Sequence, residues 1–135
     1  MKKLIAYILL FTLMFTLTAC ADAEQPITDL GAFQNQVLAD YIKFTKSSKN
    51  AEFDAFGYYG TDNGYHIVLL RLAGPHESNT HKKKIAGSVF WMGGSLQLMA
   101  YRNGEFTELW LAYDYGWVSK EAIAKAAEIH NARYG

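Results

Sequence analysis

The sequence holds a single cysteine, Cys20, and only two prolines among its 135 residues. One cysteine cannot form an intramolecular disulfide, so the folded part of the chain must rely on an ordinary hydrophobic core. Neither a Gly-x-Ser-x-Gly nucleophile motif nor a glycine-rich phosphate loop occurs. Residues 4–17 form an apolar run of about 21 Å as a helix, short of the roughly 30 Å hydrocarbon core of a bilayer. This length argues against a transmembrane anchor.

Strong charge of either sign is also lacking. Lys and Arg number 13, as do Asp and Glu; without Lys2 and Lys3 the balance is 11 basic to 13 acidic residues, a formal charge of −2. A nucleic-acid partner would call for a clustered basic face, so we expect none. No cofactor motif is present either, and we expect no cofactor.

The first twenty residues have the features of an export signal. Lys2 and Lys3 form a basic head, the apolar run follows, and small residues lead to Cys20. The four residues Leu17-Thr18-Ala19-Cys20 resemble the lipobox of bacterial lipoproteins. That resemblance implies diacylglycerol on the Cys20 thiol and cleavage before it, leaving a chain anchored in the membrane and facing away from the cytoplasm. An ordinary signal peptide ending near Ala21 or Ala23 is the alternative.

Three segments follow from this interpretation: a lipoprotein signal peptide at 1–19, a lipidated tether at 20–29 and a single α+β domain at 30–135. The domain should contain an N-terminal helix, a four-stranded antiparallel sheet and a C-terminal helical hairpin. A stripe of apolar residues predicts the helix over 30–45, capped by Thr28 or Asp29.

Four strands are predicted in two hairpins. The first pair, 53–59 and 65–72, flanks a turn ending in Asn-Gly, and the second pair flanks Gly93 and Gly94. A polar loop should occupy 74–84 between the pairs. Its "HKKK" run, 81–84, is the longest block of charge; we expect a solvated loop, with contact to anionic headgroups as the alternative.

The last third changes to helical spacing. Thr107 is a plausible cap for a helix that ends at Gly116, and Ser119 caps a final helix. A fifth strand over 109–112 is the alternative. The segment also resembles a C-terminal pattern of small, uncharacterised exported proteins of Gram-positive bacteria. That pattern, which implies no activity, is met by Asn103, Gly104, Phe106, Leu109, Ala112, Tyr113, Gly116, Ser119 and Ile123.

The histidines give a weak signal for chemistry. His76 and His81 are five residues apart in a predicted loop, whereas the zinc motif places two histidines four apart on a helix. We therefore expect no metal site there. His66 shares a strand face with apolar residues, which predicts a hydrogen-bonded core histidine, and His130 is expected to act as a cation near a helix C-terminus.

Aromatic residues are abundant, and "YDYGW", 113–117, falls at the predicted turn between helices. Tyrosine and tryptophan dominate binding surfaces. We predict that Tyr115 and Trp117 contact a ligand, and that the domain is a non-enzymatic binding module for an envelope protein, peptide or glycan. The alternative is a small envelope hydrolase that uses His66 or the His76–His81 loop.

Overall fold

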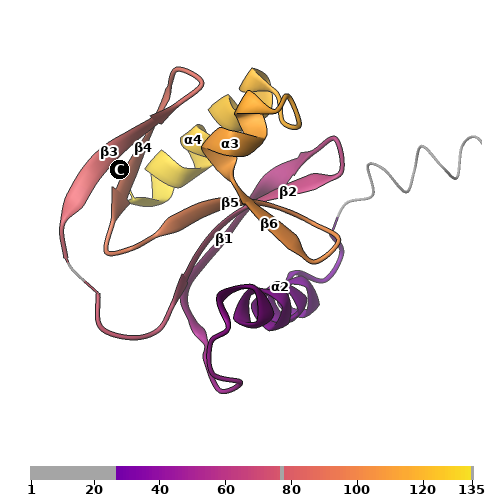
Figure 1. Cartoon of the computed structure of the whole chain (residues 1–135). Helices are drawn as coiled ribbons and strands as arrows, with labels where there is room; N and C mark the ends of the chain where they lie inside the picture. Colours follow the sequence, from indigo (N-terminus) through magenta and orange to yellow (C-terminus); the bar gives the residue numbers. More distant parts are fainter. Residues whose placement is uncertain (1–26, 77, 135) are drawn as a thin grey trace, which may run out of the picture.

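The computed structural model describes residues 27–76 and 78–134, and it is an α+β fold, as predicted (Figure 1). Four strands form one antiparallel sheet in the order β1-β2-β5-β6, and two more form a separate ribbon, β3-β4. The elements are α2 (Leu30–Thr45), β1 (Phe53–Asp62), β2 (Tyr65–Leu72), β3 (Thr80–Ile85), β4 (Ser88–Gly93), β5 (Gln97–Arg102), β6 (Glu105–Glu108), α3 (Leu109–Asp114) and α4 (Lys120–Tyr134).

Helix α2 has the predicted bounds. The Asp29 side chain caps it by accepting a hydrogen bond from the Ala32 amide at 3.0 Å. Lys46 ends it in the left-handed conformation, with φ of 56°. Only the middle of the apolar stripe is buried, at Val37 and Tyr41. One face of the helix therefore packs on the sheet while its ends stay accessible.

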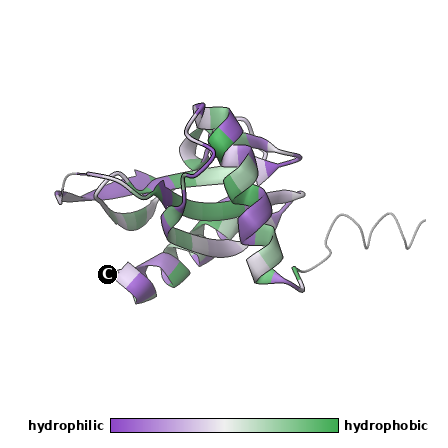
Figure 2. Ribbon diagram, turned by 90° about the horizontal axis from the view of Figure 1, so that it is seen from below, coloured by the Kyte–Doolittle hydropathy of each residue, from purple (hydrophilic) through white to green (hydrophobic). Residues whose placement is uncertain are grey.

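The sheet is apolar on both faces because α2 covers one of them and α3, α4 and the ribbon cover the other (Figures 1 and 2). Successive residues of a strand point to opposite faces, so β2 and β5 supply both cores. The core beneath α2 includes Val68, Leu70, Met99 and Tyr101. The core on the opposite face includes Ile67, Leu69, Leu98 and Ala100.

The pairing of β4 corrects the sequence-based prediction. Strand β4 pairs with β3, and β5 pairs with β2 and β6, so Gly93–Gly94 joins the ribbon to the sheet and does not turn a hairpin. The predicted polar loop over 74–84 is wrong in its second half, which is strand β3. The consecutive charged residues of β3 do not alternate with apolar ones, so the sequence lacks the period-two pattern by which a strand is predicted.

Helix α4 supplies the reason why β4 leaves the sheet. Asn131 donates from Nδ2 to the Val89 carbonyl at 2.8 Å and accepts from the Trp91 amide at 3.4 Å. The ring of His130 also contacts the Trp91 carbonyl. Side chains of α4 thus bond the backbone of β4 where a neighbouring strand would otherwise pair.

The C-terminal hairpin of helices is present, with a later and shorter first helix than predicted. Residues at the expected start of that helix pair with β5 as strand β6, and α3 begins only at Leu109 without a side-chain cap from Thr107. Helix rather than strand at 109–112 is confirmed. Ser119 caps α4 by accepting from the Ala122 amide at 3.1 Å, as predicted.

Candidate functional site

The turn between α3 and α4 is fixed at both ends. Gly116 has φ of 76°, and the Trp117 amide donates to the Ala112 carbonyl at 3.0 Å, which closes α3 in a left-handed cap. The Asn63 side chain donates to the Trp117 carbonyl at 3.1 Å. Asp62 accepts from the Ser119 amide at 2.7 Å. The tip of the β1–β2 hairpin therefore holds the turn that carries the predicted ligand-binding residues.

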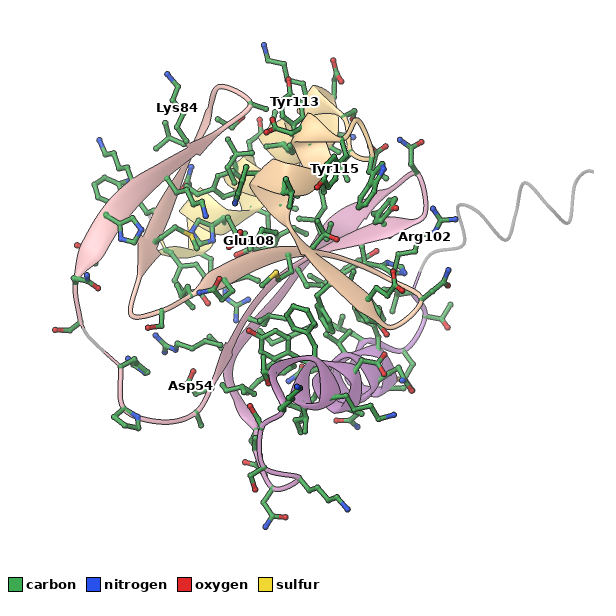
Figure 3. The ribbon with its side chains drawn as sticks, in the orientation of Figure 1. Asp54, Lys84, Arg102, Glu108, Tyr113 and Tyr115 are labelled. Atoms are coloured by element: carbon green, nitrogen blue, oxygen red, sulfur yellow. The ribbon has the colours of Figure 1, made fainter. Side chains whose placement is uncertain are left out.

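Three rings and one cation contact one another in succession along this turn, and this cluster is here called the aromatic column. Tyr65 and Trp117 are parallel within 5°, with centroids 5.3 Å apart. Tyr115 lies 4.8 Å from Trp117 at 44°, and Arg102 lies 5.1 Å from the centroid of Tyr65. Figure 3 shows Arg102 and Tyr115 on the same side of the molecule. Strands β2 and β5 thus support a column that ends at Tyr115.

The column assigns different roles to the two predicted contact residues. Trp117 contacts both of the other rings and is 37% exposed. Tyr115 ends the column and is 57% exposed. Beside the column is a cleft of about 250 Å³ lined by Tyr65, Arg102, Asn103, Glu105, Thr107 and Trp117. Tyr115 can contact a partner directly, whereas Trp117 supports it.

A second polar site lies at the other end of the sheet, around Asp54, which Figure 3 labels. The register between β1 and β2 shifts at this residue, and such a bulge redirects a side chain. Asp54 accepts from Arg71 Nε at 2.7 Å and pairs with His76 Nε2 at 3.3 Å. Arg71 also donates to the Gly94 carbonyl at 2.9 Å. These contacts attach the segment after β2 and the start of β5 to the edge of the sheet.

The Asp54 cluster opens on a cleft of about 530 Å³, with Trp91 and Tyr134 among its other lining residues. The hydrogen bond from Arg71 lowers the pKa of Asp54, with a further contribution from His76, so the carboxylate is ionised at neutral pH. An ionised carboxylate facing Nε2 orients the imidazole of His76. This pair is the part of the described structure that a general-base mechanism could use.

His66 is hydrogen-bonded and packs at the edge of the core beneath α2, as its strand position predicts, but it is half-buried and not fully enclosed. Its Nδ1 lies 3.0 Å from the Thr61 hydroxyl and 3.5 Å from that of Tyr58. The ring packs edge-on against Phe33 of α2, with centroids 4.9 Å apart. Burial lowers its pKa, so the neutral ring predominates at neutral pH.

The sequence-based prediction for the environment of His130 is wrong. His130 is not a solvent-facing cation at a helix end but a fully buried ring, 0% exposed, between β1 and β4. The Trp91 carbonyl can only accept, so Nε2 carries the proton and Nδ1 accepts from the Tyr59 hydroxyl at 2.7 Å. Burial lowers the pKa of His130, which agrees with a neutral ring. Its helical spacing with Ile123, Ala126 and Ala127 was the available signal.

His81 lies on β3, exposed and separate from the Asp54 cluster. Within residues 27–76 and 78–134, no group of three or more His, Cys, Asp or Glu side chains is arranged to hold a metal ion.

Cys20 and the four residues that resemble a lipobox lie outside the described residues. In the part of the chain that is described, no helix is both long and apolar enough to span a bilayer. No protein-family model, curated protein or solved structure matches the chain. The function must therefore be argued from the geometry above.

Proposed function

We propose that the chain is a bacterial envelope lipoprotein, anchored through diacylglycerol on Cys20, whose domain is a non-enzymatic binding module. Its contact surface is the aromatic column, with Tyr115 as the residue that touches the partner. The observation that carries this proposal is the exposed Tyr115 ring on a turn fixed by Asn63 and Asp62.

A fixed aromatic ring suits binding because little conformational entropy is lost when the partner arrives. Trp117 and Tyr65 hold the column from below, and Gly116 sets the direction of the turn. In the adjacent cleft, Arg102 can donate hydrogen bonds to carbonyl groups of a partner, and Glu105 can accept them from its amide groups. This mixture of rings and polar groups fits an extracytoplasmic protein segment, peptide or glycan.

The contact surface is tested by crosslinking on intact cells, comparing Tyr115→Ala and Trp117→Ala with the parent. Tyr115→Ala should weaken partner capture by about 2 kcal/mol or more while the protein remains as stable as the parent. Trp117→Ala should lower both capture and stability, since it removes the support of the column.

Phe44→Ala provides the matched control, because Phe44 is an exposed ring on α2 that contacts Tyr41 and Phe106 but none of the three rings of the column. It should leave capture unchanged. Capture at parental strength by folded Tyr115→Ala and Trp117→Ala proteins would show that the column is not the contact surface.

The lipid anchor is tested separately. Cys20→Ser removes the thiol that accepts the diacylglycerol, so labelling with a radioactive fatty acid should be lost. The protein should then accumulate as precursor or appear in the medium. A Cys20→Ser protein that is still processed and membrane-bound like the parent would disprove the lipobox interpretation.

The Asp54–His76 pair is the observation that favours the alternative, a small envelope hydrolase. In that case Asp54 orients His76, which would activate water in the adjoining cleft. His66 is less suited to this role, since its ring packs against Phe33, Tyr58 and Tyr101 and does not line that cleft. Hydrolysis of an ester, amide or glycoside substrate by the parent, lost in His76→Ala, would promote this function over binding.

A further inference from the structure

The β3–β4 ribbon concentrates positive charge in a chain that is neutral overall. Residues 80–93 include three lysines and His81 but no acidic residue. Helix α4 places another cation near the hairpin turn, because the Lys120 side chain lies beside Gly87. Figure 2 shows the hydrophilic colour of this ribbon at the edge of the molecule. The positive charge is thus local: it lies on the ribbon and beside its hairpin turn.

The strand register sorts the ribbon into two different faces. Residues directly opposite each other in an antiparallel pair lie on the same face. One face carries Ile85, Phe90 and Met92, all buried against the core beside α4. The other face pairs Lys82 with Trp91 and Lys84 with Val89. Both lysines are exposed there, and Figure 3 shows Lys84 projecting from the ribbon.

Apolar groups accompany the lysines on this outer face. Trp91 is 41% exposed and Val89 is 36% exposed. The Lys82 ammonium lies 4.7 Å from the centroid of the Trp91 ring. Tryptophan is enriched at the boundary between lipid headgroups and acyl chains, and lysine extends its ammonium to phosphate while its stem covers apolar surface.

We propose that the outer face of the β3–β4 ribbon docks on an anionic phospholipid bilayer. Lys82 and Lys84 bind headgroup phosphates, and Trp91 and Val89 enter the interfacial layer between them. The proposal uses the envelope location proposed above, which keeps the domain beside a bilayer. It adds an orientation: with the ribbon on the membrane, the anchored domain is held in a fixed pose.

Protection of an edge strand is the simpler role of these lysines, since charge on an exposed edge prevents pairing with other chains. That role needs no exposed ring on the partner strand. If the lysines only prevented other chains from pairing with the ribbon, Trp91 and Val89 would work against them, because an exposed apolar pair favours association. The combination of alternating lysines with an exposed tryptophan and valine therefore favours a bilayer as the partner of this face.

The test uses the full-length protein, mixed with or reconstituted into vesicles of phosphatidylcholine alone or with about 30 mol% phosphatidylglycerol, in which part of the lipid is brominated on its acyl chains. Bromine quenches tryptophan fluorescence only when the ring reaches the bilayer. The parent should be quenched more strongly in anionic than in neutral vesicles. Trp91→Phe should remove that difference, which assigns it to this ring and not to Trp110 or Trp117.

Charge is tested with a matched pair of double variants. Lys82→Gln with Lys84→Gln should reduce quenching in anionic vesicles to the neutral level. Lys43→Gln with Lys49→Gln removes the same charge from exposed positions in and after α2 and should change nothing. Equal quenching of the parent in both vesicle types, or equal effects of the two double variants, would overturn the proposal.

Flotation of the same samples separates this proposal from the lipid anchor. A chain that floats with anionic but not neutral vesicles supports the ribbon and contradicts the anchor. A chain that floats with both, yet shows no anionic quenching difference, supports the anchor and overturns the ribbon. A chain that floats with neither vesicle type overturns both the ribbon proposal and the lipid anchor. Binding of soluble polyphosphate through Lys82 and Lys84 without bilayer quenching would identify a polyanion site and overturn the bilayer proposal.

Discussion

The two faces of the central sheet are closed in different ways. On one face, α2 lays an apolar stripe over aromatic and aliphatic side chains, among them Tyr101 and Phe106. On the other, α4 contributes small apolar residues and then three polar ones that hydrogen-bond strand backbone or side chains. These are His130, Asn131 and Arg133, which reach β4 and β1.

The difference shows where directional bonds matter for this fold. Beneath α2 the packing is mainly apolar and non-directional, apart from the partly buried hydrogen bond from the Tyr101 hydroxyl to Asp40, so modest changes of shape there can be absorbed by neighbouring rings. Beside α4, each bonded polar atom of His130 and Asn131 has one partner in one place, and water cannot replace it where burial is complete. We therefore expect the α4 face to be more sensitive to loss of a hydrogen bond than the α2 face.

The largest expected effect compares the two histidines, one on each face. His130→Leu keeps the volume but leaves the Tyr59 hydroxyl and the Trp91 carbonyl without a partner, and should destabilise by about 3 kcal/mol. His66→Leu should cost less than about 1 kcal/mol, because Thr61 and Tyr58 remain accessible to water. Chemical denaturation of both variants provides the measurement. Equal losses would show that the two faces do not differ as described.

The pH dependence of stability should follow from the same two rings. Burial lowers the pKa of His66 and of His130 from 6.5; for His130 the hydrogen bond to the Trp91 carbonyl opposes this effect and the charge of Arg133 adds to it. Below 6.5 the unfolded chain binds protons that the folded chain rejects, so stability should fall as pH drops through this range until the folded pKa values are reached.

Urea denaturation midpoints measured from about pH 7.5 to pH 5 test this expectation. The range avoids Asp54, whose lowered pKa affects stability only in stronger acid. His130→Leu and His66→Leu should each flatten the curve, because each removes one group whose pKa is lowered on folding. A parent protein whose stability is unchanged or greater at pH 5 would contradict the assignment of neutral buried rings.

Local patterns predicted much of this molecule. The helical stripe and Asp29 gave α2 its bounds, the Asn-Gly turn gave the β1–β2 hairpin, and Gly116 and Ser119 located the turn between the last helices. Each of these features depends on neighbours within a few residues. The exposed position of Tyr115 followed from the same local information, through the polar residue and glycine on either side.

Non-local contacts account for the errors. Gly93 and Gly94 look like a hairpin turn until Asn131, nearly forty residues later, occupies the edge of β4. The Asp54–Arg71–His76 cluster joins three segments through a bulge that has no sequence signature. His130 could be placed on the buried face of its helix, but its partners Tyr59 and Trp91 could be known only from the fold.

The smallest expected effect concerns the edge of β4. Asn131→Ala removes one bond to the Val89 carbonyl and one from the Trp91 amide, but Asn131 is only half-buried, so water can replace both. Stability should fall by about 1 kcal/mol.

Hydrogen exchange resolves the change better than melting, because the amide of Trp91 should exchange faster while amides of central strand β2 keep their protection. Asn35→Ala is the matched control, since Asn35 is exposed on α2 and should alter neither measurement. Unchanged exchange at Trp91 would mean that Asn131 does not protect this edge. The separation of β4 from the sheet would then rest on His130 and the apolar packing of Phe90 and Met92 alone.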